Sequence, residues 1–356
     1  MSTSANILII KTSSLGDVIH TLPALTDAYT RHPQIRFDWV VEENFSEIPQ
    51  WHHAVRRLIP VALRRWRKHP YQAWRSGEWQ HFIQQLQQQN YDYIIDAQGL
   101  LKSAWLSRWA TGVRCGLDKD SARESWASWN YQHRYFIDKQ QHAVERVRQL
   151  FAKVLNYSLE QLPLDYGIAA NFQNSVKKSN TLIFLHGTTW RTKQLPESLW
   201  FELARRAIAA GFEIRLAWGS GEEFDRAQRI ATLSSRISLI NKGNLHHLAT
   251  ELLQARAVIG VDTGLAHLAA ALAIPSVTIY SSTAPQRTGT YHLRQTHVLT
   301  NFACSPCFRK KCRYPEDSAI FPPCYGSLSV HQIWQQIELL IENQNSDKSF
   351  SPIIEE

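Results

Sequence analysis

The sequence predicts an α/β protein built from two doubly wound, Rossmann-like halves. Short apolar runs alternate with amphipathic segments, a pattern typical of βα units that form a parallel sheet. The alternation stops over residues 162–180, which are rich in Pro, Gly, Asn and Ser, and then starts again. The 356 residues suit two domains of about 150 residues each. We expect a first domain over 1–165, a second over 166–330, a C-terminal helix over 331–345 and a disordered tail over 346–356.

In the first half, apolar runs predict buried strands at 7–11, 36–42, part of 54–63 and 91–99. Helical patterns end near His32 and cover 78–90 and 143–157. Pro23 leaves two alternatives for the segment after the first strand. Either one helix kinks at this proline, or residues 16–21 form a single turn and the main helix starts at Thr21.

The second half repeats the pattern, and the turns that follow its strands are the places to look for a site. The expected strands are 181–187, 213–221, 257–264 and 275–281. The expected helices are 196–211, 222–233, 244–256, 265–274 and 330–343. Ligands of doubly wound sheets bind at the carboxyl ends of strands.

Composition narrows the class of partner. The net charge of +8 favours anionic partners: nucleic acid, phosphorylated ligands or an anionic membrane surface. The sequence has no motif that reads a nucleic-acid groove, so we expect no nucleic-acid partner. No apolar run reaches about 18 residues and no secretory leader pattern is present, so we expect a cytoplasmic chain. A P-loop motif is also missing, which disfavours a P-loop NTPase.

The segment GVDTGLAHLAAAL has the features of an anion site. Asp262 follows an apolar strand, Thr263 is expected to cap the next helix, and Gly264 allows a ligand close to the backbone. The free N–H groups of the first turn suit a pyrophosphate, and His267 lies one turn further. The alternative is an ordinary capped helix that packs through its alanines.

Two further turns in the second half carry polar groups. Thr188, Thr189 and Lys193 follow a strand, and hydroxyls with an ammonium suit a phosphate, although a solvated loop explains them too. Glu223 begins a helix, where it either contacts a ribose or offsets the helix dipole. Phe224 replaces the third glycine of a dinucleotide fingerprint, which weakens the hypothesis of a nicotinamide enzyme.

The first half carries a basic cluster and one well-placed carboxylate. The cluster surrounds Trp66 and is either a solvated face or a dock for an acidic ligand; it comprises Arg64, Arg65, Arg67, Lys68 and Arg75. Asp17 follows the first strand beside Lys11, Ser13 and Ser14. It either caps a helix or acts as a general base on a ligand hydroxyl.

Four cysteines lie close together near the C-terminus: Cys304, Cys307, Cys312 and Cys324. A structural zinc site is one explanation, but the unequal spacing favours reduced packing or a redox-sensitive loop. The histidines show no paired metal-ligand spacing, so we expect no metal and no cofactor.

Several long motifs resemble the ADP-heptose glycosyltransferases, a family with the GT-B fold. They include KTSSLGDVIHTLPALTDA, IPVALRRWRK, YDYIIDAQGLLKSA and VDTGLAHLAAAL, and the resemblance covers roughly residues 6–290. It implies two Rossmann-like domains that face each other across a cleft. It also implies inverting transfer of L-glycero-D-manno-heptose from ADP-heptose to the first Kdo of Kdo–lipid A, during lipopolysaccharide inner-core synthesis. The enzyme would work at the cytoplasmic face of the inner membrane, in peripheral contact with it.

The resemblance also assigns roles by motif position. Asp17 would be the catalytic base in an acceptor-binding first domain. The second domain would bind the donor through Thr188, Thr189, Lys193, Glu223, Gly243, Asp262, Thr263, Gly264 and His267. The acceptor would contact Arg64, Arg67, Lys68 and Arg123. The cysteine-bearing segment 301–325 departs from the pattern of a first-heptose enzyme. The alternatives are a heptosyltransferase that adds the second heptose and a nucleotide-binding Rossmann oxidoreductase.

Overall fold

The computed structural model describes residues 5–172, 178–316 and 320–348, which form two compact units. The division falls between Asn171 and Phe172, further along the chain than the expected boundary after residue 165. Residues before the division still pack on the first unit: Tyr166 and Ile168 are buried, and the Asn171 side chain donates a hydrogen bond to the carbonyl of Trp51. Among the described residues, no helix combines the length and apolar character that crossing a bilayer requires.

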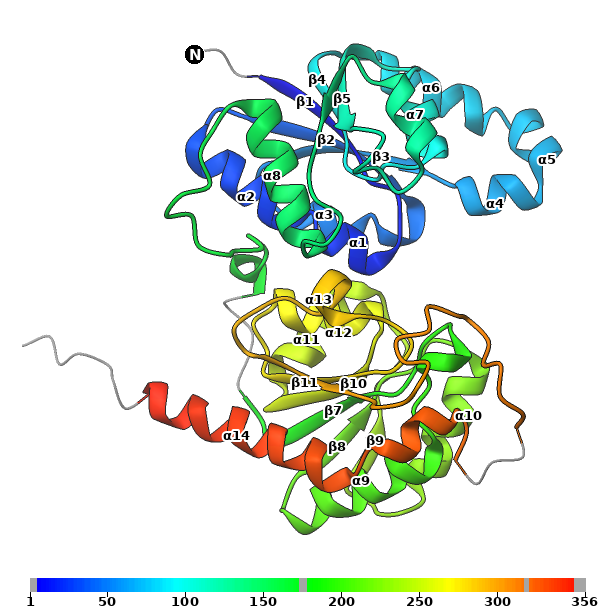
Figure 1. Ribbon diagram of the computed structural model, residues 1–356, viewed down its shortest axis with the longest axis vertical. Coiled ribbons are helices and arrows are strands. Elements are labelled where there is room, and N and C mark those ends of the chain that lie inside the picture. The colour runs from blue at the N-terminus through cyan, green and yellow to red at the C-terminus, as the bar shows by residue number, and fades with distance from the viewer. Residues whose placement is uncertain (1–4, 173–177, 317–319, 349–356) are drawn as a thin grey trace, which may run out of the picture. The chain divides into compact units, whose positions relative to one another are not determined.

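The first unit is a parallel sheet of six strands in the order β3-β2-β1-β4-β5-β6. Its strands are β1 (Asn6–Ile10), β2 (Arg36–Glu42), β3 (Val55–Val61), β4 (Asn90–Asp96), β5 (Thr111–Leu117) and β6 (His133–Tyr135). Its helices are α1 (Leu15–Ile19), α2 (Leu22–Arg31), α3 (Glu47–Gln50), α4 (Leu63–Lys68), α5 (Pro70–Arg75), α6 (Glu78–Gln87), α7 (Leu101–Ser107) and α8 (Ala143–Leu155). Figure 1 shows α2 and α8 on one side of this sheet and α6 and α7 on the other.

Burial on both faces explains the uninterrupted apolar run of β1. Leu8 and Ile10 belong to a core cluster with Phe82 and Leu86 of α6, whereas Ile7 and Ile9 alternate with them and are also fully buried. Such continuous runs are typical of parallel strands covered by helices on both sides. After β1, α1 ends at Ile19 and α2 begins with Pro23 in its first turn. The second alternative for the Pro23 segment is therefore the one observed.

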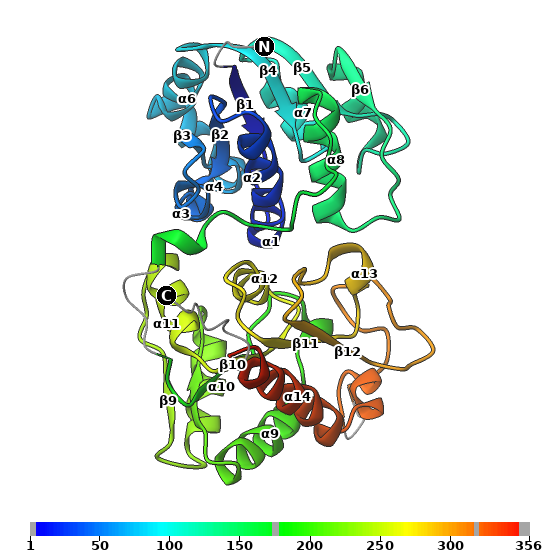
Figure 2. The ribbon, with the colours of Figure 1, turned by 90° about the vertical axis from the view of Figure 1, so that its left-hand side faces the viewer.

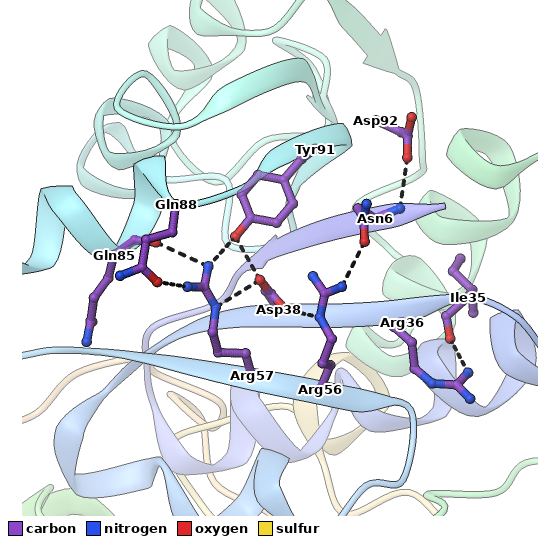
Figure 3. Close-up of polar contacts among 10 residues, drawn as sticks. All are labelled: Asn6, Ile35, Arg36, Asp38, Arg56, Arg57, Gln85, Gln88, Tyr91 and Asp92. Atoms are coloured by element: carbon purple, nitrogen blue, oxygen red, sulfur yellow. Dashed lines mark hydrogen bonds and ion pairs between the residues drawn. The ribbon is translucent and has the colours of Figure 1, made fainter. Parts of the chain in front are cut away.

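An ion-pair network around one buried carboxylate connects β2, β3 and β4, as Figure 3 shows. Asp38 of β2 is fully buried and lies 3.0 Å from the Nε atoms of both Arg56 and Arg57. Tyr91 of β4 donates a hydrogen bond of 2.9 Å to the same carboxylate. Burial and the neighbouring charge of Asp38 raise the pKa of Tyr91 to about 12. These charges satisfy one another, so the network is structural.

The second unit repeats the architecture with the strand order β12-β11-β10-β7-β8-β9. Its strands are β7 (Thr181–Leu185), β8 (Glu213–Leu216), β9 (Ile237–Leu239), β10 (Ala257–Val261), β11 (Ser276–Tyr280) and β12 (Gln295–Leu299). Its helices are α9 (Glu197–Ala209), α10 (Gly221–Ala231), α11 (Leu245–Gln254), α12 (Gly264–Ala271), α13 (Pro285–Thr288) and α14 (Val330–Lys348). Figure 2 shows α9 and α14 alongside this sheet.

Helix α14 corrects the expected organisation of the C-terminus. Ile333, Trp334 and Ile337 are buried in the core cluster of the second unit, so the helix is part of that unit. It also continues to Lys348, and the expected tail therefore does not begin at residue 346. No Gly or Pro interrupts residues 343–348, which lets the helix continue. The rest of the expected tail, 349–356, lies outside the described residues.

Candidate functional site

In the second unit, polar residues gather at the carboxyl ends of three adjacent parallel strands, β7, β10 and β11, and those after β7 and β10 are the ones chosen from the sequence. Thr188 follows β7, Asp262 follows β10 directly, and Thr283 follows β11. The hydroxyl of Thr188 donates a hydrogen bond of 3.2 Å to the main-chain carbonyl of Asp262. The sheet therefore brings together residues that are far apart along the chain.

Asp262 is the centre of this cluster. Its carboxylate lies 2.7 Å from the Lys193 ammonium and 3.6 Å from Nε2 of His267, and it accepts a 2.5 Å hydrogen bond from the Thr283 hydroxyl. Burial by itself would raise the pKa of Asp262, but the His267 hydrogen bond and the Lys193 charge outweigh it. The pKa of Asp262 therefore lies well below its usual range, and the side chain is an anion that fixes Lys193 in place.

Lys193 is the cation available to an anionic ligand in this cluster. It ends a short 3-10 helix, Arg191–Lys193, and its ammonium lies 4.6 Å from the centroid of the Trp190 ring. The ring and Asp262 restrict the side chain, which is 16% exposed. An ammonium has three N–H donors, so Lys193 can keep Asp262 as a partner while it donates to a phosphate oxygen.

Thr263 and Gly264 lie where expected, but the expected cap does not form. Thr263 is the N-cap residue of α12, and Gly264 is the first residue of that helix. The Thr263 backbone is extended (φ −144°, ψ 161°), as is usual for an N-cap residue, but its hydroxyl makes no hydrogen bond to the first turn. Thr263 therefore occupies the expected N-cap position at the end of β10, but it lacks the side-chain hydrogen bond of a cap.

Glu223 has a structural role that explains its place in the sequence. Its carboxylate accepts hydrogen bonds from the backbone N–H groups of Gly219, at 2.7 Å, and Ser220, at 3.3 Å, in a capping box at the start of α10. It also lies against the end of β7, since a Cβ atom at Gly187 would come within 2.4 Å of the Glu223 carboxyl carbon. Thr189 is exposed, and its side chain makes no hydrogen bond with the described residues 178–316 and 320–348.

Gly243 is explained by packing. A Cβ atom at Gly243 would lie 2.4 Å from Cδ2 of His247, so a larger residue would displace this ring.

Three residues around the Asp262 cluster were not predicted from the sequence. One is Thr283, although it also follows a strand. The other two are Gln194 and Arg226, which donate hydrogen bonds to the carbonyls of Thr188 and His186 respectively and so fix the loop after β7.

In the first unit, Asp17 lies in the first turn of α1 and does cap it. Its Oδ2 atom accepts hydrogen bonds of 2.8 Å from both the backbone N–H and the hydroxyl of Ser14. The carboxylate is only partly buried, and its Oδ2 atom carries both of these bonds. Capping therefore uses Oδ2 and fixes the orientation of the Asp17 carboxylate. The other oxygen, Oδ1, is then left to accept a proton, so Asp17 can also act as a base.

Gln98, just after β4, makes hydrogen bonds to the turn before Asp17. This role was not predicted from the sequence. The Oε1 atom of Gln98 accepts from the backbone N–H of Thr12 at 2.8 Å, and its Nε2 atom donates to the carbonyl of Ser13 at 2.5 Å. Gln98 lies about 80 residues after Asp17 in the sequence, so no local sequence pattern predicts this contact. Its effect is to hold the chain that leads into α1.

Lys11 places positive charge beside Asp17. It is buried, and its ammonium donates a hydrogen bond of 2.8 Å to the carbonyl of Ala97. Burial lowers the pKa of Lys11 against the opposing charges of Asp17 and Asp96. The positive charge of the exposed Arg123 lowers this pKa further, so Arg123 belongs to the same electrostatic neighbourhood as Asp17.

Some side chains of the basic cluster have partners within the protein, and others do not. Arg65 forms ion pairs with Glu43 at 3.0 Å and Glu78 at 2.8 Å, which neutralise it. The Arg64 guanidinium lies 5.2 Å from the centroid of the Phe45 ring. In contrast, Arg67 and Lys68 are exposed, and the described residues provide no ion-pair partner for either.

Three of the four cysteines line one small pocket, and Cys324 lies close enough to interact with their charges. Cys304, Cys307 and Cys312 line a pocket of about 200 Å³ together with two arginines, and all four thiols are free. Burial and the neighbouring cysteines raise the pKa of Cys324 to about 11. Among the described residues, no group of three or more His, Cys, Asp or Glu side chains is arranged to hold a metal ion.

These features define a class of fold: two Rossmann-like units with polar clusters after their parallel strands are the architecture of the GT-B glycosyltransferases. Residues 79–317 match the model of glycosyltransferase family 9 (heptosyltransferase), and the chain belongs to this family. It is therefore an enzyme, a glycosyltransferase, as the resemblance implied.

Individual relatives agree with this assignment. Lipopolysaccharide heptosyltransferase 1 of Pseudomonas aeruginosa is 48% identical over 347 residues, which cover 94% of this chain and 98% of the relative. The structure of the E. coli heptosyltransferase WaaC with ADP matches with a TM-score of 0.84 and 43% identity, covering 94% of this chain and 99% of that one. The same enzyme with ADP-2-deoxy-2-fluoro heptose matches with a TM-score of 0.81 and 44% identity, over the same shares of both chains.

Proposed function

We propose that this chain transfers L-glycero-D-manno-heptose from ADP-heptose to the first Kdo of Kdo–lipid A, with inversion at the anomeric carbon. The observation that carries the proposal is the cluster of Thr188, Lys193 and Asp262 at the ends of β7 and β10. Two similar structures, named for ADP and an ADP-heptose analogue, support the choice of donor. The name of the Pseudomonas aeruginosa relative supports the first heptose over the second.

In this proposal the second unit binds the donor. Lys193 donates to the pyrophosphate, and the N–H groups at the start of α12 add positive partial charge. Both interactions strengthen as negative charge develops on the departing ADP, which favours the transition state over the bound donor. Asp262, fixed by His267 and Thr283, keeps the Lys193 ammonium in position.

The first unit binds the acceptor and supplies the base. Arg64, Arg67, Lys68 and Arg123 bind the Kdo carboxylates or lipid A phosphates. Asp17 removes the proton from the acceptor hydroxyl as its oxygen attacks the anomeric carbon from the face opposite ADP. The new C–O bond forms as the bond to ADP breaks, so a single displacement inverts the configuration. Because its acceptor is a lipid, the enzyme works at a membrane surface, which the family resemblance identifies as the cytoplasmic face of the inner membrane.

A choice between two acceptors tests the proposal. ADP-heptose is supplied with either Kdo–lipid A or the same lipid already carrying one heptose, and products are measured by mass spectrometry. We expect the mass of one heptose to be added to the first acceptor only. Transfer confined to the heptose-bearing acceptor would show that the enzyme adds the second heptose. Calorimetric titrations with ADP and NAD complete the test, since a nicotinamide enzyme would bind NAD more tightly than ADP.

A further inference from the structure

We propose that the α4–α5 hairpin, residues 63–75, docks on an anionic lipid bilayer and places Tyr71 and Trp74 in the interfacial region. This inference rests on the proposed lipid acceptor and names the surface that meets the membrane. Figure 1 shows α4 and α5 extending beyond the end of β3. The hairpin is thus accessible on the first unit.

The aromatic side chains of α5 lie on one exposed face. Tyr71 is 66% exposed and Trp74 is 64% exposed, although both are large rings. They are three residues apart on the helix, and their ring centroids lie 6.4 Å from each other. Ala73 between them is buried, so α5 is attached to the unit through its opposite face. Amphipathic rings of this kind favour the headgroup level of a bilayer.

The charges within the hairpin itself are all positive. Residues 63–75 contain Arg64, Arg65, Arg67, Lys68 and Arg75 but no Asp or Glu. Arg65 is neutralised by Glu43 and Glu78 from neighbouring segments, whereas Arg67, Lys68 and Arg75 are exposed. Exposed aromatic rings flanked by unneutralised cations complement anionic lipid headgroups. A protein partner matched to this surface would instead need a large acidic and apolar patch.

The hairpin is firmly attached to the core, so membrane contact would orient the whole unit. The Trp66 indole N–H donates a hydrogen bond of 2.7 Å to Glu78, and its ring lies edge-on to Trp79 and Phe82, both at 5.8 Å between centroids. Trp66 and Trp79 pack against the core cluster on this side of the sheet. The inward side of the hairpin therefore anchors it, and the outward side is left for lipid.

Binding to vesicles tests this surface. The full-length protein is sedimented with vesicles of phosphatidylcholine alone or with phosphatidylglycerol added. We expect the wild type to bind the anionic vesicles, less so as salt rises, and Tyr71→Ser/Trp74→Ser to bind them roughly 30-fold more weakly. Both changed side chains are exposed, and melting temperature checks that folding is unchanged.

A second aromatic pair provides a matched control. Trp126 and Trp129 are 61% and 66% exposed, and they lie in the connection from β5 to β6. Strands β3 and β6 are at opposite edges of the sheet, so this pair is remote from α4 and α5. Trp126→Ser/Trp129→Ser should bind vesicles like the wild type. An equal loss in both double variants would overturn the assignment of the contact to α5.

Kinetics on two acceptors separates this inference from the proposed function. Tyr71→Ser/Trp74→Ser should raise the KM for a vesicle-embedded acceptor and leave turnover on a water-soluble, deacylated acceptor unchanged. A wild type that transfers heptose to the soluble acceptor but ignores anionic vesicles would refute the docking surface alone. Failure to transfer to either acceptor would refute the proposed function. Self-association of the wild type that disappears in the double variant would assign the surface to a second copy, and would also overturn the inference.

Discussion

Two substitutions at Asp17 separate its role as a helix cap from its role as a base. In Asp17→Asn the amide oxygen can still accept from the backbone N–H and the hydroxyl of Ser14, which both lie 2.8 Å from the native carboxylate. Asp17→Ala loses both contacts. We expect Asp17→Asn to change stability by less than about 0.5 kcal/mol and Asp17→Ala to lose about 1–2 kcal/mol. For a unit of this size, the latter corresponds to a melting temperature about 2–8 °C lower.

Turnover should respond differently, because only a carboxylate supplies basicity. We expect both variants to lose about two to four orders of magnitude in turnover, regardless of their difference in stability. Initial rates of ADP release, calorimetric ADP affinity and thermal melting are measured on each variant. Asp165→Asn is the matched control, because Asp165 is an exposed carboxylate of the same unit that accepts one backbone N–H, from Gly167. Near-normal turnover in Asp17→Asn would refute the assignment of Asp17 as the base.

Three further predictions concern the two binding surfaces. Lys193→Met should raise the donor KM about 10- to 100-fold because one charge-assisted hydrogen bond is lost, and an unchanged donor KM in initial-rate assays would contradict this role. Arg67→Gln/Lys68→Gln should raise the acceptor KM far more than the donor KM, with an effect that shrinks as salt rises; equal effects on both substrates would count against an acceptor surface. In the folded protein the pKa of Asp262 lies below the ordinary value of 3.8 for this side chain, so its ionised form stabilises the fold above pH 3.8, and this contribution is lost on acidification. Asp262→Asn should therefore cost about 2–4 kcal/mol in denaturant unfolding at pH 7, and the cost should fall progressively as the pH is lowered below 3.8, whereas a constant difference would show that the charge is not responsible.

The long, fully buried strands could be predicted from the sequence, but the short strands at the edges could not. Strands β1 and β10 are apolar throughout because helices cover both faces of the sheet. In contrast, β6 and β9 have only three residues each, and β12 (QTHVL) begins with three polar residues and ends with only two apolar ones. These short strands form because they pair with a neighbouring strand. The hydrophobic periodicity of so few residues is too weak to predict a strand.

The candidate site shows the same limit. Residues such as Thr188 and Asp262 could be chosen because they directly follow predicted strands. The ion pair between Lys193 and Asp262 could not, since it joins segments about 70 residues apart and depends on the adjacency of β7 and β10. The contacts of Gln98 with the turn before Asp17 also depend on strand order, which local sequence does not encode.

The central claim is a single inverting transfer of heptose, and the products of one incubation test it most directly. The protein is incubated with ADP-heptose and Kdo–lipid A, the lipid is weighed by mass spectrometry, released ADP is quantified, and the new anomeric centre is assigned by NMR. We predict one heptose added per acceptor, one ADP released per heptose transferred, and an anomeric configuration opposite to that of the donor. ADP release without a heavier lipid, or a product that retains the donor's configuration, would contradict the account.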